Sequence, residues 1–227
     1  MPDKIEQEIE QDNIKTKIQT IITPDDNSEI RKVTLENRGL EEEILEITAY
    51  FEPVLSKKEQ DYAHPVFNNL FLKFNYDENT NSILVKRRTR EKSEQKIYLA
   101  VNLVAPEIET IGQLEFEIDK EKFTGRGNIQ IPEMVKNSTP LSQKISLVTE
   151  GIIALKRTIK IKPQEKVELD LVISVGESKE IALENIKKYQ NKENVAKAFE
   201  ISKAQIEAQS RYLRIKGKDI EQYQKIL

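Results

Sequence analysis

Apolar side chains recur at every second position in two stretches near the middle of the chain, residues 43–51 and 63–76. This period of two is typical of β-strands that have one buried face and one solvated face. A strand of this kind cannot bury its apolar face alone, so partner strands must lie elsewhere in the chain. The residues that share these faces are Leu45, Ile47, Ala49 and Phe51 in the first stretch and Leu70, Leu72, Phe74 and Tyr76 in the second.

The same alternation recurs along most of the chain and predicts about ten strands, spaced as in a β-sandwich and without the alternating helices of βαβ units. In residues 153–161 the apolar face carries one charged residue, Arg157. The other predicted strands are residues 14–23, 29–36, 82–88, 96–104, 114–118 and 167–175. The predicted fold class is therefore mainly β, an antiparallel β-sandwich.

Three local patterns add detail to this prediction. Asn37-Arg38-Gly39 is typical of a short turn and predicts a hairpin that pairs residues 29–36 antiparallel with residues 43–51. Ile5 and Ile9 are four residues apart and predict a short helix within residues 1–13. Pro65 favours an extended conformation at His64, which would lead the chain into the next strand.

The spacing of apolar residues changes to that of helices after residue 177. Ser178 is a suitable N-cap for a first helix, and a second is expected from Asn194 to Leu213. Asp219 would cap a third helix, which has no stop signal before Leu227. The sequence thus predicts a sandwich in residues 1–176 and a helical linker in residues 177–227, cut from a longer protein.

Composition excludes several classes of function. The chain has no cysteine, one histidine and a net charge of −3, from 36 basic and 39 acidic residues. These counts exclude disulfides and Cys-based or multi-His metal sites, so no metal or other cofactor is expected. They give no reason to expect binding to nucleic acid or to a membrane. The polar N-terminal residues lack the apolar core of a secretory signal, which indicates a cytoplasmic protein.

Five segments of the sequence, taken in order, carry a family resemblance: Thr23–Arg38, Glu46–Leu55, Ala63–Phe71, Lys86–Arg90 and Phe123–Gly127. Together they resemble the sandwich region of cyclic β-1,2-glucan synthases. These enzymes belong to glycoside hydrolase family 94, formerly glycosyltransferase family 36. The resemblance covers residues 14–215, nearly the whole chain.

The resemblance implies a galactose-mutarotase-like β-supersandwich, or its later part, followed by a helical linker. In that family an (α/α)6-barrel performs the chemistry, and a barrel Asp serves as the general acid. Nothing in this sequence is similar to the barrel, so no catalytic residue is assigned and the chain itself is not expected to be an enzyme. The implied partners are the barrel domain of a parent glycosyltransferase or phosphorylase, a β-glucan, and a second copy in a homodimer.

Four residues are the candidates for contact with carbohydrate: Tyr62, His64, Phe67 and Arg126. Exposed aromatic rings suit sugar platforms, and without tryptophan only Tyr62, Phe67, Tyr50 and Tyr98 are available. Each candidate has a structural alternative. The rings suit core or interface packing, His64 suits a bend before a strand, and Arg126 suits a brace against a neighbouring domain. Gly125-Arg126-Gly127 lacks the Gly-Lys-Ser/Thr ending of a phosphate loop.

Other interpretations remain open at this stage. The basic run Lys86–Lys92 would suit a phosphate or an acidic partner, and equally a solvated turn at a strand end. The chain as a whole would also suit a stand-alone carbohydrate-binding module. A third alternative is a structural or adhesion sandwich unrelated to sugars, which a seven-stranded immunoglobulin-type unit would favour.

Overall fold

The computed structural model describes residues 3–89, 94–126 and 128–214. Ten strands and six helices occur in this part of the chain. The strands are Ile5–Gln11 (β1), Ile14–Ile22 (β2), Ser28–Asn37 (β3), Glu43–Phe51 (β4), Leu72–Asp77 (β5), Ser82–Arg87 (β6), Tyr98–Val104 (β7), Thr110–Asp119 (β8), Gly151–Ile161 (β9) and Lys166–Gly176 (β10). The helices are Lys58–Ala63 (α1), Pro65–Asn69 (α2), Lys120–Thr124 (α3), Glu133–Lys136 (α4), Lys179–Tyr189 (α5) and Lys192–Tyr212 (α6).

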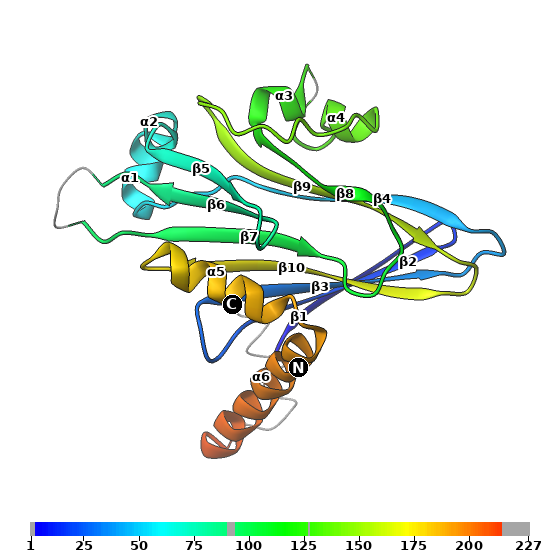
Figure 1. Cartoon of the computed structure of the whole chain (residues 1–227). Helices are drawn as coiled ribbons and strands as arrows, with labels where there is room; N and C mark the ends of the chain where they lie inside the picture. The colour runs from blue at the N-terminus through cyan, green and yellow to red at the C-terminus, as the bar shows by residue number, and fades with distance from the viewer. Residues whose placement is uncertain (1–2, 90–93, 127, 215–227) are drawn as a thin grey trace.

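The strands form two antiparallel sheets of unequal size (Figure 1). The larger sheet has seven strands in the order β1-β2-β3-β10-β7-β6-β5, and the smaller has three in the order β4-β9-β8. The inner faces of the two sheets enclose the main core, in which Val101, Leu155 and Leu169 are completely buried. The predicted antiparallel β-sandwich is confirmed.

Helices α5 and α6 begin on the outer face of the larger sheet (Figure 1). Ser178 caps α5 by accepting a hydrogen bond from the Ile181 N–H, as its sequence position predicts. Ile186 of α5 and Val195 of α6 are completely buried in a second apolar cluster, which includes Val172 of β10. Farther along, α6 extends away from the sheets (Figure 1).

The predicted hairpin between residues 29–36 and 43–51 is wrong. β3 pairs with β2 and β10, whereas β4 pairs with β9 in the other sheet. The short connection therefore crosses from one sheet to the other. The Asn37 amide stabilises the crossing, because its nitrogen donates to the carbonyl oxygens of Glu41 and Ile161 and its oxygen accepts the Gly39 N–H.

Two further local predictions are also wrong. Residues 5–11 form the edge strand β1 instead of a helix, paired along its whole length with β2. The spacing of Ile5 and Ile9 fits both structures because four residues is an even number, so it also places them on one face of a strand. His64 leads into the short helix α2 instead of a strand, because Pro65 occupies its first position, where a missing N–H is tolerated.

Two sequence features lie partly or wholly outside the described residues: the predicted helix after Asp219, and the Arg90–Lys92 end of the basic run. Within the described part of that run, Arg87 donates to the Asn68 side-chain oxygen and Arg88 to the Leu70 carbonyl oxygen. Both guanidinium groups also lie over the Phe71 ring. These arginines therefore hold α2 against the end of β6.

Candidate functional site

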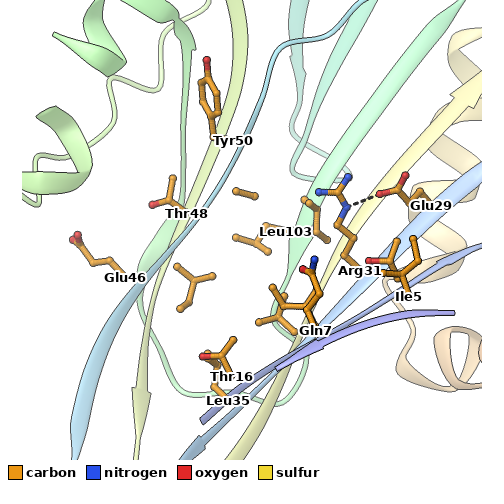
Figure 2. Close-up of a pocket in the computed structure, with 16 residues that line it drawn as sticks. Ile5, Gln7, Thr16, Glu29, Arg31, Leu35, Glu46, Thr48, Tyr50 and Leu103 are labelled. Atoms are coloured by element: carbon orange, nitrogen blue, oxygen red, sulfur yellow. Dashed lines mark hydrogen bonds and ion pairs between the residues drawn. The ribbon is translucent and has the colours of Figure 1, made fainter. Parts of the chain in front are cut away.

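The unequal sheets leave an open cleft along the edge strand β4 (Figure 2). β4 is the last strand of the smaller sheet on this side, whereas the larger sheet continues through β3, β2 and β1. The inner face of these three strands is therefore only partly covered. The resulting cleft has a volume of about 720 Å³, which lies within the usual range for ligand sites.

Most of the interior of the cleft is apolar. Its walls include Ile18 and Val33 on the larger sheet and Ile47 and Ala49 on the smaller, all of them half-buried. On β1 the apolar side chains are more exposed still, with 66% of the surface of Ile5 and 64% of that of Ile9 accessible. Such a surface is typical of one that packs against another protein element.

Polar side chains lie mainly at the margins of the cleft. Figure 2 shows Glu46, Thr48 and Tyr50 pointing away from the larger sheet. The Tyr50 ring stacks on Phe123, with 5.1 Å between the ring centroids. Its hydroxyl donates to Glu52, and burial together with this carboxylate raises its pKa. Tyr50 therefore packs on the outer side of β4 and does not form a sugar platform in the cleft.

The two carboxylates that line the cleft are both ion-paired. Glu29 binds the Arg31 guanidinium (Figure 2), and Glu46 lies 3.3 Å from the Lys156 ammonium group. Acid–base hydrolysis of a glycosidic bond needs two opposed carboxyl groups, one of which carries a proton in the resting enzyme. Glu29 and Glu46 lie on separate strands, and each binds a cation of its own sheet, so they do not form such a pair.

Ion pairs on the opposite face of the larger sheet hold β1 in place. Lys17 bridges Glu6 and Glu8, and Lys15 also binds Glu8. Hydrogen bonds from Lys17 and then Gln19 lower the pKa of Glu6 to about 2. The charged face of β1 is thus joined to β2, while its apolar face forms the outer part of the cleft.

Three of the four predicted carbohydrate-contacting residues lie together on the α1–α2 segment. Tyr62 is 89% exposed and Phe67 is 49% exposed, and the His64 side chain is also accessible. His64 and Phe67 border a shallow, mainly apolar depression of about 420 Å³ together with Ala63, Pro65, Val66 and Leu70. The segment thus presents aromatic and apolar side chains to solvent.

The fourth predicted residue, Arg126, lies elsewhere. It is exposed in the connection after α3 and does not border the depression at α1–α2. The preceding Gly125 has a φ of 57°, and a side chain there would overlap Glu133. Glycine is therefore required both by the backbone and by the close approach of α4. The remaining aromatic candidate, Tyr98, is half-buried against the cluster under α5.

The cleft itself was missed by sequence reasoning. Its outer wall includes Ile5 and Gln7 of β1. The spacing of Ile5 and Ile9 on this strand is visible in the sequence but was interpreted as helical. In the described part of the chain, no cluster of three or more His, Cys, Asp or Glu residues is arranged to hold a metal ion. The described helices include none that is long and apolar enough to cross a membrane.

The fold and the open cleft define this chain as an antiparallel sandwich module with helices on its outer face. The family model described as "Glycosyl hydrolase 94, supersandwich domain" matches residues 1–192. The chain therefore belongs to the glycosyl hydrolase 94 supersandwich family, and the resemblance seen in the sequence is confirmed.

A curated relative supports the same assignment. The chain is 24% identical over 213 residues to the cyclic beta-(1,2)-glucan synthase NdvB of Rhizobium meliloti (strain 1021). The match covers 93% of this chain but only 8% of the relative. The chain is thus similar to a small part of a much longer protein.

Two solved structures are similar to this chain at low sequence identity. A bacterial glucoamylase in complex with acarbose has a TM-score of 0.50 and 12% identity, over 88% of this chain and 28% of that one. A polysaccharide lyase has a TM-score of 0.43 and 13% identity, over 82% of this chain and 23% of that one. The glucoamylase likeness concerns the fold alone.

Proposed function

We propose that this chain is a non-catalytic β-sandwich module of a carbohydrate-active enzyme related to β-glucan phosphorylases or cyclic β-1,2-glucan synthases. It would support the catalytic domain, an (α/α)6-barrel, and act in the cytoplasm. The observation that carries the proposal is the open apolar cleft beside β4 in a chain of the supersandwich family. A partly uncovered core face is stabilised when another element packs against it.

The arrangement of α6 supports the same role. Its first turns are anchored by Val195 and Ala198 in the cluster on the outer face of the larger sheet. The rest of the helix extends away from the sheets (Figure 1). A helix fixed at one end in this way is suited to connect the sandwich rigidly to a following domain.

The ion-paired carboxylates of the cleft support a role without catalysis. We expect the purified chain to release no glucose 1-phosphate from a β-1,2-glucan in the presence of inorganic phosphate. Release at a rate proportional to protein concentration would contradict the proposal. We also expect a barrel of this type to be encoded in the same reading frame or in a neighbouring gene, and the absence of both would argue against a scaffold role.

Binding to the barrel can be tested directly once its gene is identified. We expect a one-to-one complex by light scattering, weakened by the change Ile18→Glu in the cleft. Tyr62→Ala is the matched surface control, because Tyr62 is exposed on a different segment. If Tyr62→Ala abolished the complex and Ile18→Glu did not, the interface would lie at α1–α2 and not at the cleft.

The exposed aromatic residues of α1–α2 favour a second function, that of a carbohydrate-binding module. In this case calorimetry would detect binding of a β-glucan, and Tyr62→Ala or Phe67→Ala would abolish it. Binding unaffected by either substitution would remove these residues from the site. The seven-plus-three arrangement differs from an immunoglobulin-type unit, so a sandwich unrelated to sugars is not favoured.

A further inference from the structure

Arg157 is a charged residue on the inner, otherwise apolar face of β9, between Leu155 and Ile159. Its Nε donates to the Leu103 carbonyl oxygen of β7 at a distance of 3.1 Å. This carbonyl lies beyond Val101, where the pairing of β7 with β6 ends. Burial lowers the pKa of Arg157. Across the described residues, its two terminal nitrogens have no hydrogen-bond or ion-pair partner, so they are available to a ligand.

The neighbouring strand β8 is interrupted next to Arg157. Its pairing with β9 passes from Ile111↔Thr158 to Glu115↔Lys156, so residues 112–114 of β8 lie opposite Arg157 alone. Gly112 within this bulge has a φ of 75° and no neighbouring atom within 4 Å of the position of a Cβ. β-Bulges of this kind are common beside functional sites, because they redirect the chain away from its partner strand.

The bulge borders a second pocket, distinct from the cleft at β4, with a volume of about 470 Å³. The Tyr76 ring stacks on Phe116, with 4.6 Å between centroids, and its hydroxyl donates to the Asn81 side-chain oxygen at 3.1 Å. This contact joins the β5–β6 turn to the pocket. The polar side chains that line the pocket are Tyr76, Glu78, Asn81, Gln113, Gln143 and Arg157.

The mixture of groups in this pocket indicates the class of ligand. Arg157 supplies donors, Glu78 supplies acceptors, and the amides of Asn81, Gln113 and Gln143 supply both. Sugar hydroxyls both donate and accept, so they match this combination. A phosphate group is mainly an acceptor, and the Glu78 carboxylate would repel its negative charge. We propose that this pocket binds a short segment of a neutral β-glucan, with hydrogen bonds from the Arg157 guanidinium to sugar hydroxyls.

This inference rests on the proposed function for its choice of sugar. It can be tested with linear β-1,2-linked gluco-oligosaccharides, titrated into the full chain and followed by calorimetry and by amide chemical shifts. We expect saturable binding and about a tenfold loss of affinity in Arg157→Gln, the size expected for losing a hydrogen bond from a charged group. Thermal unfolding of each variant checks that the fold is intact.

Two milder variants keep the test valid if Arg157→Gln does not fold. Gln113→Ala and Asn81→Gly remove exposed amides from the pocket, and glycine suits the φ of 50° at position 81. Each is expected to weaken binding about three- to tenfold. Gln130→Ala is the matched control, because Gln130 is also exposed but does not border the pocket.

Several outcomes would overturn the inference. Failure to bind any oligosaccharide would do so, and so would binding that all three pocket variants leave unchanged. Binding lost in Tyr62→Ala or Phe67→Ala alone would place the sugar at α1–α2. Binding of inorganic phosphate but not of sugar would exclude the proposed ligand class. None of these results concerns the scaffold role, which depends on the glucose 1-phosphate assay and on the complex with the barrel.

Discussion

The Tyr189 hydroxyl donates a hydrogen bond of 2.7 Å to the carboxylate of Asp26, which lies 163 positions earlier in the chain. Lys188 binds the same carboxylate oxygen at 2.8 Å, and Thr23 donates to the other at 2.6 Å. These bonds connect the β2–β3 turn to the last turn of α5. They therefore fix the position of the helical segment on the outer face of the larger sheet.

Tyr189→Phe should remove one of these bonds without removing the buried ring. We expect the free energy of unfolding to fall by about 1–2 kcal/mol, as for a hydrogen bond to a charged group. Urea denaturation followed by circular dichroism measures the change. Tyr212→Phe is a suitable control, because this tyrosine is 87% exposed near the end of α6. Equal effects of the two changes would contradict the role of the Asp26 contact.

The same carboxylate predicts a dependence on pH. Burial tends to raise the pKa of Asp26, but the bonds from Lys188, Thr23 and Tyr189 together lower it below its ordinary value. Because the pKa is lower in the folded state, the contribution of Asp26 is present above about pH 4 and is lost as the pH falls through the folded-state pKa. Asp26→Asn should therefore unfold more easily than the wild type at pH 7, with a smaller difference near pH 3.

Asp170 of β10 should show the opposite dependence. It is 2% exposed, and its Oδ1 is buried with no hydrogen-bond partner within the described ranges. Burial raises its pKa to about 6, against weaker attraction from Lys32 and Lys192. The folded state then holds the proton more tightly than the unfolded state. The loss of stability caused by ionising the buried Asp170 is therefore absent below about pH 4. It grows up to about pH 6 and persists at higher pH.

Asp170→Asn should consequently stabilise the protein at pH 7.5 by up to about 3 kcal/mol, the equivalent of the shift in pKa. The two proteins should differ much less at pH 4. Thermal or urea unfolding at both pH values tests this, and Asp25→Asn is the exposed control. A destabilised Asp170→Asn at pH 7.5 would mean that the ionised carboxylate has a stabilising partner.

Lys156 is a buried cation between two carboxylates on the outer face of the smaller sheet. Its side chain is 3% exposed, 3.3 Å from Glu46 and 3.4 Å from Glu115, and it donates to the Thr139 carbonyl oxygen. Lys156→Met should lower the free energy of unfolding by about 3 kcal/mol, because two carboxylates lose their cation. Adding Glu46→Gln and Glu115→Gln to this variant should restore part of the lost free energy of unfolding. If the triple variant is no more stable than Lys156→Met, the electrostatic explanation is excluded.

Gly151 begins β9 where the Phe74 ring of β5 approaches its backbone. A Cβ at this position would overlap the edge of that ring. Gly151→Ala should therefore destabilise the protein by about 1–3 kcal/mol through overpacking. The double variant Gly151→Ala with Phe74→Leu should lose less free energy of unfolding than the two single variants lose together. Urea denaturation of the wild type, both single variants and the double variant measures this in a double-mutant cycle. Strict additivity would show that the ring is not the cause.

The candidate sites were only partly predictable. Tyr62 and Phe67 were named from the sequence as rings available to a sugar, with core or interface packing as the alternative, and the structure exposes both. The cleft and the pocket at Arg157 were not predicted. The cleft depends on which strands face each other. The pocket also depends on a bulge that places residues 112–114 opposite one residue of β9. Neither relationship leaves a local signal in the chain.

By itself, the sequence determined which segments are extended and which side of each is apolar. Alternation along residues 43–51, 153–161 and 167–175 predicted β4, β9 and β10, and Ser178 located the start of α5. This information is local, because side chains on a strand alternate between its two faces whatever its partners are.

Only the tertiary structure decided how these strands are distributed between the two sheets. A short connection such as the one after Asn37 is compatible with a hairpin and with a crossing between sheets. The chain crosses between the sheets because β3 pairs with β10 whereas β4 pairs with β9. In both pairs the partner strands are more than a hundred residues apart in the sequence. The unequal sheets, and thus the open cleft, result from these distant pairings, whose hydrogen bonds and buried area do not depend on neighbouring residues in the sequence.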